Sequence, residues 1–250
     1  MTESKISADY LFHYTTELKH LTNIMTNFFM PFYCMEKLSY IDDLYGDGTD
    51  LIHAFPIVCF CDIPNNLQDN HKENFGPYGI GLTKTWGIKN YLSPVIYTHK
   101  NSIISGNLKF FLKWLANEDN LQEDDRLGLR NHISYQLMSH KAYEGYKFIK
   151  EEKSFEVEEL TRFYDEREWR YLPLNCNGLK LWLNESEFKS EILKLENQRI
   201  QDCNRLEFQI SDIEYLILKG NSEINPFLSE LSIKYFEEKL KRIKEKIIIN

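Results

Sequence analysis

The chain has little glycine, proline and cysteine, and these shortages exclude several classes of protein. Eleven glycines and seven prolines among 250 residues are too few for a fibrous or low-complexity chain. The five cysteines are an odd number and contain no C-x-x-C pair, so we expect neither a disulfide framework nor a zinc knuckle. An apolar fraction of 42% also excludes a disordered chain.

Long apolar runs and targeting signals are also missing. No uninterrupted apolar stretch approaches the roughly 18–20 residues that a membrane span needs. The first ten residues, MTESKISADY, lack the basic and apolar regions of a secretory signal. The sequence therefore predicts a soluble, cytoplasmic protein that has no membrane partner.

The negative charge of the chain is unevenly distributed. Thirty Lys and Arg face 38 Asp and Glu, a net charge of −8, yet residues 76–113 contain five lysines and no acid. Aromatic residues lie between these lysines, a pattern that suits a single-stranded nucleic acid, whose bases stack on aromatic rings. The alternative is five unrelated, solvated lysines. Phe111 and Leu112 belong to an apolar helix stripe, so we expect only part of the segment to face solvent.

The spacing of apolar residues predicts short strands and amphipathic helices in irregular alternation. The expected strands are Tyr10–Tyr14, Phe55–Cys61, Tyr78–Thr83, Pro94–Thr98, Glu168–Leu172, Leu179–Leu183 and Ile213–Leu218. The expected helices are 18–28, 65–74, 104–115, 131–148, 185–203 and 225–248. The segment 179–183 is expected to form a hairpin with 168–172.

This order lacks the regular β-α-β alternation of a parallel sheet. We therefore expect an α+β fold with flanking helices, as one domain over residues 1–250. Residues 1–183 form the expected core, and residues 184–250 a C-terminal elaboration of helices and strand. Its two long helices, 185–203 and 225–248, are expected to cap the sheet; the alternative is that they mediate assembly.

Several familiar catalytic motifs are absent from the sequence. It contains no G-x-x-x-x-G-K-[ST], no G-x-G-x-x-G opening a helix, no H-E-x-x-H and no G-x-S-x-G. The seven histidines are dispersed, so no metal site is expected. Cys59 and Cys61 share one strand face, where buried free thiols are the expectation.

Three ordered motifs nevertheless stand out. The first is Phe12-His13-Tyr14-Thr15, a strand leading into a helix. The second is Phe55–Pro64, followed by His71 and by Tyr78-Gly79-Ile80-Gly81-Leu82. The third, Glu166-Arg167-Glu168-Trp169-Arg170, opens a strand and places Glu168 and Arg170 on one face. Such a pair is either a simple ion pair or, in a cleft, a site for ribose hydroxyls and phosphate.

With these motifs the sequence resembles the AbiGi-type abortive infection proteins of bacterial phage defence, over roughly residues 10–175. More remotely, the order of a strand His, a central aromatic and a late strand Glu is similar to the ADP-ribosyltransferase superfamily. Within it the DarT-type enzymes, which modify nucleic acid, are the most similar. The remote resemblance implies a mixed or split sheet, with NAD as substrate and no metal.

The same resemblance implies roles for individual residues. Glu168 would be catalytic by stabilising the oxocarbenium-like transition state and helping to deprotonate the acceptor, and Glu166 would orient that acceptor. His13 would bind the adenosine ribose, Thr15 the nicotinamide amide, and Tyr78 would stack on the nicotinamide ring. Further residues of the expected NAD site are Tyr14, His71 and Arg170.

Each of these residues also has an ordinary structural role open to it. His13 suits a buried core position, Thr15 a helix cap, and Glu168 an ion pair with an arginine. The leading hypothesis is an NAD-dependent ADP-ribosyltransferase with a nucleic-acid or protein acceptor. The alternative is a non-enzymatic, antitoxin-like partner protein of a two-component system. A metal-independent nuclease using His13 or His71 is a third option.

Overall fold

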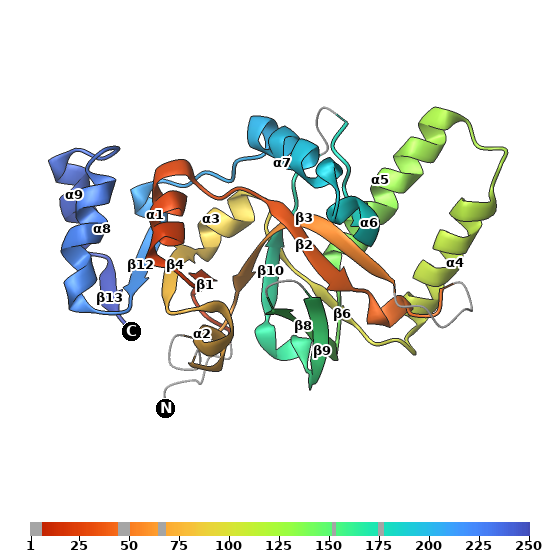
Figure 1. The fold of residues 1–250 in the computed structure, drawn as a ribbon, viewed down its shortest axis with the longest axis horizontal. Coiled ribbons are helices and arrows are strands. Elements are labelled where there is room, and N and C mark those ends of the chain that lie inside the picture. Colours follow the sequence, from red (N-terminus) through yellow and green to blue (C-terminus); the bar gives the residue numbers. More distant parts are fainter. Residues whose placement is uncertain (1–6, 45–50, 65–68, 152–153, 175–177) are drawn as a thin grey trace.

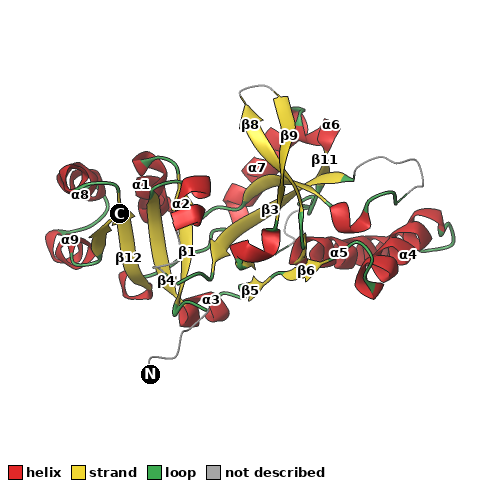
Figure 2. Ribbon diagram, turned by 90° about the horizontal axis from the view of Figure 1, so that it is seen from below, coloured by secondary structure: helices red, strands yellow, loops and turns green. Residues whose placement is uncertain are grey.

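The computed structural model describes residues 7–44, 51–64, 69–151, 154–174 and 178–250. These residues form an α+β fold built on a mixed sheet, as the sequence predicts (Figure 1). Figure 2 shows two sides of the molecule, one holding β12, β4 and β1 with their helices, the other holding the α4–α5 pair. The long strand β3 connects the two sides.

Within the described residues the main sheet has nine strands in the order β13-β12-β4-β1-β3-β10-β5, with β2 and β11 also paired to β3. Its strands are β1 (Tyr10–Thr15), β2 (Phe32–Lys37), β3 (Ile52–Cys61), β4 (Tyr78–Thr83), β5 (Ser93–Pro94), β10 (Glu168–Tyr171), β11 (Leu183–Asn184), β12 (Ile213–Leu218) and β13 (Ile247–Ile249). All pairs are antiparallel except β12 with β13. Two small sheets pair β6 (Ile96–Thr98) with β7 (His140–Ala142), and β8 (Gly145–Glu151) with β9 (Ser154–Thr161).

The helices are divided between two apolar clusters. The helix bounds are α1 (Leu18–Asn27), α2 (Asp69–Phe75), α3 (Lys84–Lys89), α4 (Ile103–Asn117), α5 (Glu123–Ser139), α6 (Glu185–Phe188), α7 (Glu191–Cys203), α8 (Ile224–Leu231) and α9 (Glu237–Lys244). The first cluster joins β1, β4 and β12 to α1, α3, α8 and α9. The second joins β2 and the first half of β3 to α4, α5 and α7. No helix of the described residues has the length and apolar character to cross a membrane.

Strand β3 begins at Ile52, before the expected limit at Phe55, and continues through Pro56. Pro56 falls between the stretch that pairs with β10 (Val58–Cys61) and the two residues that pair with β11 (His53 and Ala54). On that edge of β3 its missing N–H removes no bond to β10 or β11, and on the other edge Pro56 lies opposite Tyr33 of β2. This extra length allows β3 to belong to both apolar clusters.

The Gly-x-Gly of β4 has a packing role. A Cβ on Gly81 would lie 2.8 Å from the Phe12 ring, and one on Gly79 would lie 3.0 Å from the Tyr14 ring. Phe12 and Tyr14 project from the opposite strand β1, which pairs with β4 over its whole length. The two glycines therefore make room for aromatic rings laid flat on the sheet.

Three of the expected helices differ strongly from the structure. The helix expected at 131–148 is wrong in both limits, because α5 begins at Glu123 and ends at Ser139, where the chain enters β7. Three acids, Glu123, Asp124 and Asp125, fill the first turn of α5, where negative charge stabilises the helix N-terminus. The following strands β8 and β9 were not predicted, because their charged side chains hide the strand alternation.

The expected helix 185–203 is broken in two. Helix α6 ends at Phe188, and Ser190 is the N-cap of a second helix, α7. The Ser190 side chain accepts a hydrogen bond from the Ile192 N–H. Leu195 of α7 is 64% exposed. Segment 179–183 does not pair with β10, because Leu183 opposes Ala54 of β3 instead.

The expected helix 225–248 is also wrong, since it comprises α8, a turn, α9 and strand β13. In the turn, the Tyr235 hydroxyl donates to the Met25 carbonyl and Lys234 Nζ to the Thr26 carbonyl. These bonds satisfy carbonyls at the end of α1 that have no partner inside that helix. The turn leaves Ile233 and Phe236 exposed, contrary to the expected apolar stripe.

Candidate functional site

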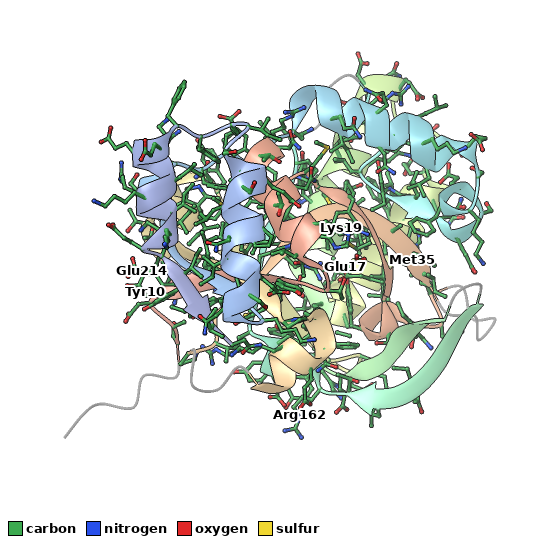
Figure 3. The ribbon with its side chains drawn as sticks, turned by 60° about the vertical axis from the view of Figure 1, so that its left-hand side comes forward. Tyr10, Glu17, Lys19, Met35, Arg162 and Glu214 are labelled. Carbon is green, nitrogen blue, oxygen red and sulfur yellow. The ribbon has the colours of Figure 1, made fainter. Side chains whose placement is uncertain are left out.

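A cavity of about 810 Å³ opens where the two apolar clusters meet. Strands β1 and β3 pair only at Phe12 and Cys61, while β2 pairs with β3 from Ile52 to Ile57. Residues 58–60 of β3 lie between these two partners. The cavity occupies this gap, with α1, β2 and α7 as its walls. Figure 3 labels Glu17 at the beginning of α1 and Met35 on β2, the two elements that flank it.

His13 crosses the gap between β1 and β3. Its Nδ1 lies 2.8 Å from the Cys59 carbonyl oxygen, which only accepts hydrogen bonds, so Nδ1 carries the proton. Burial lowers the pKa of His13, which keeps the ring neutral. The other nitrogen, Nε2, is then an acceptor, and it makes no hydrogen bond to the described residues. Because His13 lines the cavity, it offers this acceptor to a ligand.

Glu168 lines the same cavity but is held in a cluster of charges. Its Oε1 lies 2.6 Å from Arg170 Nε and its Oε2 lies 2.5 Å from Lys141 Nζ. Lys141 Nζ also binds Glu166, and the Arg170 guanidinium binds Glu36. Burial alone would raise the pKa of Glu168, but the charges of Arg170 and Lys141 outweigh it and hold that pKa well below its usual range. Glu168 is therefore ionised, and only 5% of it is exposed.

The structure brings some of the predicted site residues together. His13, Tyr14, Thr15, Glu166 and Glu168 all line the cavity. Thr15 does not cap α1, whose N-cap is Glu17; its hydroxyl donates to the Glu17 carbonyl instead.

Other predicted site residues lie elsewhere. The Tyr78 hydroxyl donates to Glu223 at 2.6 Å, a bond that raises the pKa of Tyr78 to about 12, and Tyr78 does not line the cavity. Arg170 lies behind Glu168 and is buried, so it is an ion-pair partner rather than part of the cavity wall. His71 falls in α2, but its side chain lies outside the described residues.

Sequence reasoning missed Lys141 and Glu36. Lys141 was placed inside an expected helix, and Glu36 lies on β2, which was not predicted. The aromatic pair Phe32-Tyr33 directly after Pro31 is the local signal for a strand at β2, because aromatic residues are enriched in strands. No local pattern brings Lys141 to Glu168, because the two are 27 residues apart and belong to different sheets.

Three cysteines line the cavity without forming disulfides. Cys34, Cys59 and Cys61 are free. Burial raises the pKa of Cys34 and of Cys61 to about 12, and that of Cys59 well above its usual range. Protonated thiols of this kind are unreactive, as expected for Cys59 and Cys61. Among the described residues no group of three or more His, Cys, Asp or Glu side chains is placed to hold a metal ion.

The basic segment 76–113 does not border the cavity, since none of its residues lines it. Lys84 is paired with Asp62 at 2.9 Å. Its other lysines lie on α3, on α4 and before α4, elements that Figure 1 shows well apart. Exposed aromatic residues do occur here, Tyr91 and Phe110 among them. Nucleic-acid binding by this segment stays a prediction.

Comparison with known proteins identifies the family. A family model described as "Putative abortive phage resistance protein AbiGi, antitoxin" matches residues 27–219. A protein of Lactococcus lactis subsp. cremoris named "Abortive phage resistance protein AbiGi" is 28% identical over 237 residues, covering 89% of this chain and 94% of that relative.

No solved structure matches the chain. These findings confirm the resemblance to AbiGi proteins and give no support to the ADP-ribosyltransferase resemblance. Since the family model spans more than half of its residues, the chain belongs to the AbiGi family of abortive phage resistance proteins.

Proposed function

We propose that this protein is the antitoxin of a two-component abortive infection system and acts by binding and neutralising a partner toxin. The observation that most supports a non-enzymatic role is the state of Glu168, the carboxylate that an ADP-ribosyltransferase would need. It is buried, and Lys141 and Arg170 occupy both of its oxygens. The family description, which includes the word antitoxin, favours the same function.

The charges around Glu168 explain why this state opposes catalysis. Cleavage of the bond between nicotinamide and ribose develops positive charge on the ribose, which a nearby carboxylate stabilises through its negative field. Lys141 and Arg170 lie within 2.6 Å of the Glu168 oxygens, so neither oxygen is free to approach the ribose or to bind its hydroxyl. Freeing the carboxylate requires breaking two buried ion pairs, a costly change.

Growth assays in a bacterium test the antitoxin proposal. Cells that express this chain alone should grow normally. Cells that express the toxin gene of its locus should stop growing, and co-expression of both should restore growth. The two proteins should then elute together in size-exclusion chromatography. Growth arrest by this chain alone, or arrest that persists on co-expression, would contradict the proposal.

A second candidate function is NAD-dependent ADP-ribosyl transfer to a nucleic acid or a protein, and one observation favours it. His13 and Glu168 line a single cavity, and its volume of about 810 Å³ falls in the range of small-molecule sites. His13 Nε2 offers an acceptor suited to a ribose hydroxyl, and Glu166 lies beside Glu168 on the same Lys141. NAD would then be the substrate.

Labelled NAD distinguishes the two candidates. The protein is incubated with NAD carrying a label on its adenylate phosphate, in lysate with and without phage infection. Transfer predicts label in a product that nuclease or protease removes, and loss of that label in Glu168→Gln and Glu166→Gln. Glu191→Gln is the matched control, because the Glu191 side chain is 81% exposed on α7. Absence of both labelled product and released nicotinamide would exclude the transferase.

A further inference from the structure

The charged cluster beside the cavity is not neutral. It contains three carboxylates, those of Glu36, Glu166 and Glu168, against the ammonium of Lys141 and the guanidinium of Arg170. The sum of these charges is −1.

Neighbouring groups do not correct this imbalance. His13 is held neutral by burial. The nearby cation Lys84 is already matched by Asp62. Arg167 donates from its Nε to the Asp62 carbonyl and does not line the cavity. Within the described residues Glu166 has Lys141 as its single partner, and Lys141 is shared with Glu168. The unmatched negative charge therefore resides on the part of the cluster formed by Glu166 and Glu168.

This charge faces the cavity rather than bulk water. Glu36, Glu166, Glu168 and Lys141 all line the cavity, and at most 17% of any of these side chains is exposed. A net charge on side chains that are so little exposed costs free energy until an opposite charge joins it. The site therefore favours a cation and repels an anion such as a phosphate ester.

The remaining walls of the cavity indicate the chemical character of the rest of the ligand, beyond its charged group. Much of the cavity is apolar, with walls that include Ile24, Phe28, Phe29, Met30 and Val58. Four amide side chains on the facing helices α1 and α7 add hydrogen-bonding groups: Asn23, Asn27, Asn197 and Gln201. An apolar body with one charged end matches this lining.

We propose that the cavity binds an organic monocation, an amine or amidine in its protonated form attached to an apolar or aromatic body. The charged end lies against Glu166, and the body lies between α1 and β3. This site goes beyond the antitoxin function and does not depend on it.

A pair of probes of the same shape tests the proposal. Benzamidinium is a flat aromatic monocation, and benzamide is its neutral counterpart. Isothermal titration calorimetry at neutral pH should show benzamidinium binding at least about tenfold more tightly than benzamide, because only the cation balances the cluster. Added salt should weaken the binding of benzamidinium only. Equal binding of the two probes, or binding of neither, would overturn the proposal.

Variants locate the binding site. Glu166→Gln removes one negative charge, so benzamidinium should bind about as weakly as benzamide does to the wild type. Glu191→Gln makes the same change in overall charge on the exposed face of α7 and should bind like the wild type. If both variants lose the preference for benzamidinium over benzamide, the preference comes from the overall charge of the protein, and the proposed cation site in the cavity is wrong. If Glu166→Gln fails to fold, the comparison of benzamidinium with benzamide on the wild-type protein still tests the proposal. Growth rescue tests the antitoxin role separately.

Discussion

A methyl group added to Gly81 meets a buried aromatic ring. Its Cβ would lie 2.8 Å from Phe12, which is 1% exposed and stacks between Tyr14 and Tyr215. Gly81→Ala should therefore lower the free energy of unfolding by about 1–3 kcal/mol through overpacking. Urea denaturation followed by circular dichroism measures this difference.

Gly106 provides the matched control for that substitution. It lies inside α4 and has nothing within 4 Å of its added Cβ. Gly106→Ala should therefore raise the free energy of unfolding by about 0.5–1 kcal/mol, because alanine favours the helix. Equal effects of the two substitutions would show that the ring over Gly81 moves aside freely.

Glu168 should make stability depend on pH. Its pKa in the folded protein lies below the ordinary value of 4.5, so the ionised form stabilises the fold. That stabilisation is complete above the unfolded-state pKa and is lost as the pH falls below it. Wild-type protein should therefore lose stability on acidification below about pH 5.

The variant Glu168→Gln separates this effect from general acid denaturation. At pH 7 it should be about 3–5 kcal/mol less stable, because Lys141 and Arg170 lose their shared carboxylate. Between about pH 5 and pH 3 its stability should change less steeply than that of the wild type. Parallel pH curves from thermal unfolding would contradict the assignment.

The local sequence predicted three of the five residues of this cluster, Glu166, Glu168 and Arg170. Strand alternation placed Glu168 and Arg170 on one face, and they do form an ion pair. Their other partners, Lys141 and Glu36, come from β7 and β2. Which distant strands become neighbours depends on the pairing of the whole sheet, and short-range periodicity carries no information about it.

Ser190 determines where one element ends and the next begins. Its hydroxyl accepts from the Ile192 N–H at 3.2 Å at the beginning of α7. Ser190→Ala should cost about 1 kcal/mol, as expected for loss of an N-cap. Ser229→Ala, on the exposed side of α8, should change stability by less than about 0.5 kcal/mol. Thermal unfolding of both variants measures the difference. Equal losses of stability in the two variants would show that the Ser190 side chain does not stabilise α7 as an N-cap.

Element prediction succeeded where apolar residues dominate. The expected limits of β4 and β12 match the structure, because Ile, Leu and Gly leave little room for another interpretation. It failed for 225–248, where helical spacing continues through the turn at 232–236. The contacts that impose this turn, from Lys234 and Tyr235 to the end of α1, join residues more than 200 positions apart.

The C-terminal segment, residues 184–250, contributes strands to the main sheet and is not a peripheral addition to it. Strand β12 lies between β4 and β13, and its residues Ile213, Leu216 and Leu218 are fully buried. The same segment pairs Leu206 with Phe29 and accepts a hydrogen bond from Trp86 Nε1 at the Glu207 carbonyl. Residues 1–183, expected from the sequence as the core, therefore lack part of the first apolar cluster.

A truncation tests this dependence at the scale of the whole molecule. A chain of residues 1–203 loses β12 and exposes the apolar edge and face of β4, so it should fail to unfold cooperatively. Circular dichroism during thermal unfolding and the dispersion of NMR signals measure this. Co-expression with a separate fragment of residues 204–250 should restore the native signals, because that fragment supplies the missing strand. A truncated chain that unfolds cooperatively by itself would instead show that residues 204–250 are an independent addition to a self-sufficient core.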